Sequence, residues 1–208
     1  MSRILPILFN TNMVRAILDG EKTVTRRVVG EKVVIVRKDQ EINKNLNGRF
    51  ELYNITSRCG LPQNVFFKPP YQPGDILYIR ETWSEWTGGY VYKAWNEPFP
   101  QPGKSSIMKW HPSIHMPKEA ARIWLKVTDV RVERLQDITI AEVIKEGCSD
   151  LWIDAARPMK LIDVAGNKNE FTSLWNLTLK KSDLDRYGWV ANPWVWVIEF
   201  ERCVKPEK

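Results

Sequence analysis

The chain has 208 residues, of which 43% are hydrophobic and 27% charged, a composition typical of a globular protein with a sizeable buried core. Its 31 Lys and Arg against 25 Asp and Glu give a net charge of +6, which favours anionic partners but lacks the density of a nucleic-acid-binding tail. No apolar run is long enough to span a bilayer, and residues 1–9 lack a signal-peptide cleavage pattern. We therefore expect a cytoplasmic protein without a membrane partner.

Near the N-terminus, a predicted strand at 4–9 leads into a helix at 11–19 and then into a basic segment at 20–27. Asn10 or Thr11 can cap this helix, and Gly20 suits the position after its last turn. The segment Gly-Glu-Lys-Thr-Val-Thr-Arg-Arg then places three cations and two hydroxyls directly behind the helix. Such a cluster is either a solvated loop end that complements the helix dipole or a functional site.

Strand patterns dominate the rest of the chain. Runs rich in branched and aromatic residues predict strands at 27–36, 49–55, 76–80, 90–95, 122–135 and 194–201. Further helices are expected at 139–146 and 170–180, with a short turn at 118–121. These elements predict an α+β fold. Polar or Pro/Gly-rich stretches near 38–48, 60–73, 97–106 and 181–191 are interpreted as loops inserted into a single domain over residues 1–208.

The helix at 139–146 has a well-defined start, because Thr139 and Glu142 form a capping box. This register places Glu146 in the last turn, just before Gly147 and four residues after Glu142. The helix dipole and the like charge of Glu142 both disfavour a carboxylate there. Either solvent covers this cost, or a cation from elsewhere in the fold, such as Lys22 or Arg26, lies beside Glu146.

The chain contains ten tryptophans, and their positions suggest two uses. In the last strand, Trp194, Trp196, Ile198 and Phe200 share one face, and the start of this strand is expected to be buried on both faces. Core packing is expected for these two tryptophans and for Trp124 and Trp175. Trp83, Trp86 and Trp95 lie beside loops and are candidates for a binding surface.

Cysteine and histidine contribute few candidates for chemistry. Cys59, Cys148 and Cys203 are far apart and form no C-x-x-C pair, so neither a disulfide framework nor a thiolate zinc site is expected. His111 and His115 flank Pro112 in a segment that favours extended or turning backbone over a helix. No metal or cofactor is therefore expected, and any chemistry must use Lys, Thr, Ser, Glu, Asp or Tyr.

Together, these motifs resemble the ASCH domain, a PUA-like β-barrel family, especially its longer versions in phage and prophage genomes. The resemblance rests on residues 20–27 behind the first helix, on Pro-Gly-Asp-Ile-Leu-Tyr-Ile-Arg-Glu-Thr-Trp at 73–83, on 122–147 and on the closing strand at 192–200. It implies a PUA-like mixed β-barrel with a few short helices and long loop insertions. It also implies a basic cleft near the first helix that binds RNA or nucleosides.

One bacterial member of this family is an N(4)-acetylcytidine amidohydrolase whose proposed catalytic groups are a lysine and a threonine in a G-x-K-T-x-T segment and a glutamate at the end of a short helix. Carried over by position, the resemblance implies Lys22 as base, Thr25 as nucleophile and Glu146 as acid. Thr23, Arg26 and Arg27 become candidate ligand contacts. In a fully extended segment, Lys22 and Thr25 would face opposite sides, so a turn near Lys22 is required.

Other assignments remain open. Arg80, Glu81 and Trp83 belong to the phage-type pattern and are further candidate binding residues, with Glu81 as an alternative acid or base. A second hypothesis is a non-catalytic RNA or nucleotide binder, or an RNA-cleaving variant, in which arginines contact phosphate while Tyr78, Trp83 or Trp86 stack on bases. A third is a structural or interaction role, to which the many tryptophans give some support.

Overall fold

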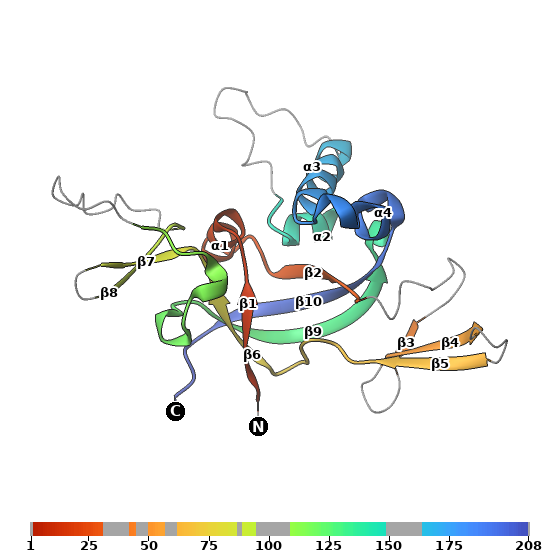
Figure 1. The fold of residues 1–208 in the computed structure, drawn as a ribbon, viewed down its shortest axis with the longest axis horizontal. Coiled ribbons are helices and arrows are strands. Elements are labelled where there is room, and N and C mark those ends of the chain that lie inside the picture. Colours follow the sequence, from red (N-terminus) through yellow and green to blue (C-terminus); the bar gives the residue numbers. More distant parts are fainter. Residues whose placement is uncertain are drawn as a thin grey trace.

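The computed structural model describes residues 2–30, 42–44, 50–56, 62–86, 89–94, 109–148 and 164–207 and has the expected α+β class (Figure 1). Its centre is a five-stranded mixed sheet with the order β1-β6-β9-β10-β2. β1 pairs with β6 in parallel, and the other three pairings are antiparallel. The strands are β1 (Ile4–Leu8), β2 (Val24–Val28), β6 (Ile76–Arg80), β9 (Trp124–Arg134) and β10 (Trp194–Cys203).

Strand β10 organises the core because both of its faces are buried, as its sequence pattern predicts. Trp196, Ile198 and Phe200 belong to a cluster that includes Val14 and Ile17 of the first helix. Val195 and Val197, on the opposite face, pack in a second cluster with residues of the two later helices. The expected burial of Trp124, Trp175 and Trp196 is confirmed, whereas Trp194 is half-buried.

Helix α1 (Thr11–Leu18) forms where its capping residues predict. The Asn10 side chain accepts a hydrogen bond from the backbone N–H of Met13, so Asn10 is the N-cap. Asp19 ends the helix, and Gly20 follows with φ +81°, a conformation that glycine adopts at little cost. The helix connects β1 to β2, which lie at opposite edges of the main sheet (Figure 1).

Helix α2 (Ile140–Lys145) has Thr139 as its N-cap and the predicted capping box, with Glu146 as its C-cap. Helix α3 (Val164–Leu177) begins earlier than the predicted 170–180 and packs beside α2 (Figure 1). The sequence pattern missed the first turns of α3 because residues 164–169 carry few apolar side chains at helical spacing. Both helices lie over the sheet at the β2 side.

Several stretches predicted to be loops contain regular structure. β3 (Ile42–Lys44) lies in the predicted loop at 38–48, β5 (Pro62–Phe67) in the one at 60–73, and α4 (Leu184–Tyr187) in the one at 181–191. β3 and β5 flank β4 (Phe50–Thr56) in a separate three-stranded sheet, and β7 (Trp83–Trp86) pairs with β8 (Gly89–Tyr92) as a hairpin. Single 3-10 turns lie at Ser113–His115, Lys118–Ala120, Leu135–Asp137, Lys181–Asp183 and Trp189–Ala191. The predicted loop at 97–106 falls outside the described residues.

Strand boundaries differ from the predictions mainly at β2. It begins at Val24 rather than at residue 27, because its first residues pair with Ile198 and Glu199 of β10. Residues 31–36 of the predicted strand fall outside the described residues. Within the described part of the chain, β1 and β2 do not pair with each other, so the sheet does not close into a barrel there. None of the helices described has the length and apolar character needed to cross a bilayer.

Candidate functional site

The basic segment at 20–27 bends before it enters β2. The backbone N–H groups of Glu21 and Lys22 both donate to the Ala16 carbonyl, which turns the chain back against α1. Lys22 then forms an isolated antiparallel bridge with Glu146, and the Thr23 N–H donates to the Lys145 carbonyl at 2.9 Å. The chain therefore turns directly before Lys22 and meets the end of α2 there, while the placement of Lys22 and Thr25 on one side stays a prediction.

The Lys22 side chain is fully buried and its ammonium has three acceptors. Nζ donates to the Val24 carbonyl at 2.8 Å, to the Glu146 carbonyl at 2.8 Å and to Glu146 Oε2 at 2.6 Å. An ammonium has three protons to donate, so each can be used. Burial lowers the pKa of Lys22, while the Glu146 carboxylate opposes this shift.

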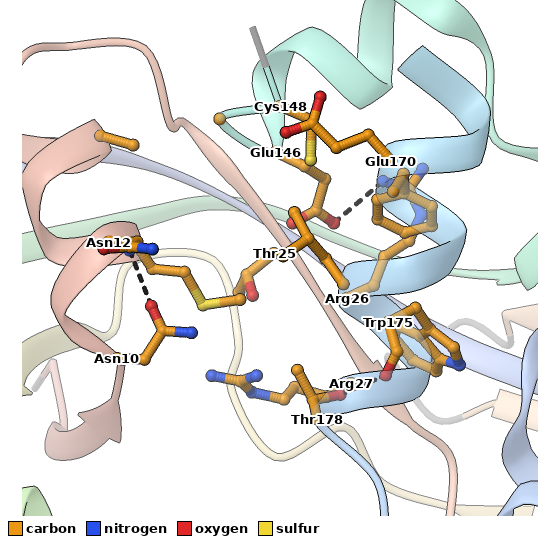
Figure 2. Close-up of a pocket in the computed structure, with 15 residues that line it drawn as sticks. Asn10, Asn12, Thr25, Arg26, Arg27, Glu146, Cys148, Glu170, Trp175 and Thr178 are labelled. Carbon is orange, nitrogen blue, oxygen red and sulfur yellow. Dashed lines mark hydrogen bonds and ion pairs between the residues drawn. The ribbon is translucent and has the colours of Figure 1, made fainter. Parts of the chain in front are cut away.

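The carboxylate of Glu146, at the C-terminal end of α2, is stabilised by protein cations and not by solvent. Its side chain is only 7% exposed, and its two carboxylate oxygens meet different cations. Oε2 accepts from Lys22, and Oε1 accepts from Arg26 at 3.1 Å (Figure 2). Of the two alternatives that the sequence leaves open, the cationic partner is correct. Both of the cations suggested for this role are present.

Gly147 allows the end of α2 to approach α1 and Lys22. A Cβ atom at this position would lie 2.8 Å from Ala16 Cβ and 3.2 Å from Lys22 Cβ. Its φ of +84° also lies in the left-handed region, which other residues rarely adopt. A glycine is therefore required here for two separate reasons, and both serve the contact between Lys22 and Glu146.

Arg26 is a buried cation that links Glu146 to a larger charge network. Its guanidinium is 1% exposed and also lies 3.2 Å from Glu142 and 3.4 Å from Glu133. Arg131 continues the network through ion pairs with Glu133, Glu142 and Glu199. Burial acts to raise the pKa of Glu142, but the Thr139 N–H and the charges of the two arginines outweigh it and lower that pKa. Arg26 therefore neutralises the protein's own carboxylates.

A pocket opens between α1, β2, the end of α2 and α3 (Figure 2). Its volume is about 150 Å³, and a cavity of about that size admits a single benzene-sized ring. The residues that line it are Asn10, Asn12, Met13, Ala16, Thr25, Arg26, Arg27, Glu146, Gly147, Cys148, Glu170, Phe171, Leu174, Trp175 and Thr178.

Thr25 is buried, yet it contributes to the wall of this pocket together with Glu146. Its neighbour Val24 provides the carbonyl that receives the Lys22 ammonium, so Nζ lies beside the peptide group that joins Val24 to Thr25. Among the described residues, no hydrogen-bond partner of the Thr25 hydroxyl is present. The three residues carried over as catalytic therefore lie near one end of β2, where Thr25 and Glu146 line the pocket and Lys22 does not. Thr23 contributes backbone hydrogen bonds to Lys145 and Phe200 and does not line the pocket.

Arg27 differs from the other two cations of the segment. It is half-buried, its Nη2 donates to the Leu8 carbonyl at 2.8 Å, and its Cζ lies 5.4 Å from the centre of the Phe9 ring. Within the described part of the chain, it has no ion pair with a carboxylate. Burial lowers the pKa of Arg27, an effect that the Glu146 charge opposes, and the group remains a cation at any ordinary pH.

Arg80, Glu81 and Trp83 lie elsewhere in the fold and do not line this pocket. The buried Glu81 carboxylate receives two hydrogen bonds from Arg122, at 2.9 and 3.0 Å, and Arg80 donates to the Ile114 carbonyl. Trp83, a candidate for a binding surface, is buried. Its side chain is 6% exposed and packs against Tyr90 and His111. Trp95 and the side chain of Trp86 fall outside the described residues.

Sequence reasoning missed two walls of the pocket. The sequence assigns Asn10 only a capping role and gives no signal that Asn12 and Met13 line a pocket, and the pattern around Trp175 indicates core packing. Trp175 does both, since it is 7% exposed and still borders the cavity. Cys148 also lies in the wall, where burial and the charges of Glu146 and Glu170 raise its thiol pKa to about 12, so it is not a nucleophile at neutral pH.

Comparisons with known proteins identify no relative: no family model, curated protein or solved structure matches the chain. Across the described residues, no group of three or more His, Cys, Asp or Glu side chains is placed to hold a metal ion. The pocket and the charges that surround it are therefore the features from which a function can be inferred.

Proposed function

We propose that this chain is an ASCH-type, PUA-like amidohydrolase that removes the acyl group from N(4)-acylated cytidine. The observation that carries the proposal is the buried ion pair of Lys22 and Glu146 beside a pocket that Thr25 also lines. The open five-stranded sheet, with α1 linking its two edge strands, is compatible with the core of such a fold. The size of the pocket suits a single pyrimidine ring.

The proposed roles need a proton to move within the Lys22–Glu146 pair. Transfer from the ammonium to the carboxylate converts two buried charges into a neutral amine and a neutral carboxyl group, and burial favours neutral forms. Lys22 is then a base and Glu146 an acid. Arg26, which stays bonded to Glu146, favours the carboxylate and so keeps this form a minor one until substrate excludes water.

In the proposed reaction, the Lys22 amine takes the proton of the Thr25 hydroxyl while its oxygen bonds to the acyl carbon. The bond from this carbon to N4 then breaks, and the leaving nitrogen takes the Glu146 proton, which releases cytidine. A water molecule attacks the resulting ester and gives its proton to Glu146, while the Thr25 oxygen recovers a proton from Lys22. The products are cytidine and a carboxylic acid, and all three side chains return to their starting forms.

The experiment is incubation of the purified protein with N(4)-acetylcytidine and quantification of cytidine and acetate by chromatography. Thr25→Val retains the shape of the side chain without its hydroxyl, so we expect a loss of activity of about 10³-fold or more. Thr25→Ser retains the nucleophile and serves as the matched control, with measurable turnover. Equal thermal melting curves would show that both variants fold. Hydrolysis by Thr25→Val at the wild-type rate would refute the assignment.

A second candidate, a non-catalytic RNA or nucleotide binder, is favoured by one observation. All three Lys22 donors are occupied by protein acceptors, which is how a purely structural ammonium is held. In that case the cavity would bind its ligand without turnover. This alternative predicts RNA binding that weakens as salt is added, with no release of acetate from N(4)-acetylcytidine. Undetectable RNA binding at low salt would exclude it.

A further inference from the structure

The pocket has an uneven distribution of charge, and this unevenness points to its ligand. Lys22 lies behind the wall of the pocket and Arg26 lines it, and the charges of both are balanced by carboxylates. Arg27 also lines the pocket, and it has no ion pair among the described residues. One of its N–H groups donates to Leu8, and the fork of its guanidinium has further donors.

Carboxylates gather at the other end of the cavity. Glu146 and Glu170 both line the pocket together with Cys148. Figure 2 shows Cys148, Glu146 and Glu170 grouped together, whereas the Arg27 guanidinium extends away from them toward Asn10. An anionic ligand group would therefore meet attraction at the Arg27 end and repulsion at the Cys148 end.

The three cations of this segment also differ in how deeply they are buried. The Lys22 and Arg26 side chains are almost completely enclosed, while Arg27 is half-buried and is the cation of this segment that solvent reaches most readily. Thr25 and Arg27 are two residues apart in β2, so they lie on one face with Cα atoms about 6.6 Å apart. The cavity volume of about 150 Å³ holds one ring, so any sugar attached to that ring must lie toward the mouth.

This arrangement matches the shape of a cytidine nucleotide. In a cytosine ring, the exocyclic N4 and the ribose are attached at opposite sides, so a ring with its acylated N4 beside Thr25 directs its ribose toward the mouth. A phosphate on the ribose 5′-oxygen would extend farther in the same direction, where the Arg27 fork is available. Arginine binds phosphate through paired N–H donors, which makes it well suited to this role.

We propose that the pocket takes the 5′-monophosphate of an N(4)-acylated cytidine, with Arg27 as the residue that binds the phosphate and selects nucleotide over nucleoside. The inference rests on the proposed function for the orientation of the ring. It extends that function by naming the substrate class, a mononucleotide with a dianionic phosphate.

The test measures binding by titration calorimetry, using cytidine and cytidine 5′-monophosphate as probes with the wild-type protein. A charge-assisted phosphate contact predicts that the monophosphate binds about 10- to 100-fold more tightly than cytidine. It also predicts that added salt weakens the binding of the monophosphate and leaves the binding of cytidine unchanged. Arg27→Gln should abolish this preference, so that the variant binds the two probes with equal affinity. Arg202→Gln is the matched control, because Arg202 also donates to a main-chain carbonyl, that of Leu18, but does not line the pocket.

The outcomes separate this inference from the proposed function. Equal binding of the two probes would overturn the inference, although hydrolysis of N(4)-acetylcytidine could still occur. A preference that survives in Arg27→Gln would overturn the role of Arg27. Tighter binding of a single-stranded oligoribonucleotide than of the monophosphate would overturn the choice of a mononucleotide. Absence of binding by both probes would overturn the inference, and the proposed function falls with it only if N(4)-acetylcytidine is also not hydrolysed.

Discussion

Two buried carboxylates in this molecule have cationic partners, but they are satisfied in different ways. Glu81, between β6 and β7, accepts two hydrogen bonds from one arginine, Arg122, and has no second cation among the described residues. Glu146, at the end of α2, divides its two oxygens between Lys22 and Arg26. The first is a closed pair of one anion and one cation. The second is part of a network that borders a cavity.

The difference shows why the second site is the better candidate for chemistry. In the closed bidentate pair the cation is an arginine, which does not give up a proton in proteins, so the Glu81 pair stays ionised. At Glu146 one of the two cations is a lysine, which can give its proton to the carboxylate, and Arg26 keeps Glu133 and Glu142 as partners when Glu146 becomes neutral. Both glutamates are sequence candidates, and their partners distinguish them.

The largest expected effect comes from removing one cation from each site. Arg122→Met leaves the Glu81 carboxylate buried without a partner and should lower the free energy of unfolding by about 3 to 5 kcal/mol. Lys22→Met leaves Glu146 paired with Arg26, so we expect a smaller loss, about 1 to 2 kcal/mol. Urea denaturation of both variants measures the difference. If Lys22→Met proves as destabilising as Arg122→Met, the two sites are equivalent and the comparison fails.

A second experiment tests the backbone contact that holds the Glu146 site together. Gly147→Ala should destabilise the protein by about 3 kcal/mol, because it combines an unfavourable φ with a clash against Ala16. Gly20→Ala is the matched control, since Gly20 has a similar φ of +81° but nothing within 4 Å of the added Cβ. We expect a loss of about 1 kcal/mol there. If Gly147→Ala and Gly20→Ala shift the denaturant midpoint equally, the close approach of Gly147 to α1 contributes nothing to the stability difference.

The smallest expected effect concerns the outer part of the network. Because the pKa of Glu142 is lowered in the folded protein, its ionised form stabilises the fold above the ordinary pKa of 4.5, and this contribution is lost as pH falls below that value. Glu142→Gln retains a residue suited to the capping box and removes only the charge. Wild type should be more stable than this variant by about 1 kcal/mol at pH 7, and the gap should close in acid.

Thermal unfolding at a series of pH values from 7 down to 3 provides the measurement. Glu201→Gln is a suitable control, because Glu201 is 60% exposed and only 3.9 Å from Lys126, so its removal should change little at any pH. A gap between wild type and Glu142→Gln that stays constant over the whole range would contradict the role given to the Glu142 charge.

Local signals predict much of the fold. The Asn10 cap, the Thr139–Glu142 capping box and the alternation in β10 each depend on residues close in sequence, and the structure confirms all three. Regular structure inside polar stretches was missed, since the short strands β3 and β5 gain their pairing from β4 rather than from their own pattern. The loop predictions were therefore wrong where strand pairing depends on a neighbouring strand.

The site was predictable only in part, for a similar reason. The poor electrostatic position of Glu146 at a helix end indicated that a cation was needed, and this could be deduced from the sequence alone. The contribution of α3 to the pocket could not be deduced in this way, because Trp175 and Phe171 fit a core pattern equally well. Whether Trp83 is exposed depends on its packing against His111, which is 28 residues away in the chain.

The pairing of β2 has a consequence for the order in which the molecule is built during synthesis. β2, at residues 24–28, precedes β10, at residues 194–203, which is its partner in the main sheet among the described residues. A growing chain therefore carries Thr25, Arg26 and Arg27 on an unpaired strand until residues 194–203 have left the ribosome. Such long-range pairing forms slowly. Since β2 carries one wall of the pocket, we expect ligand binding by a growing chain to report that β10 has paired with this strand.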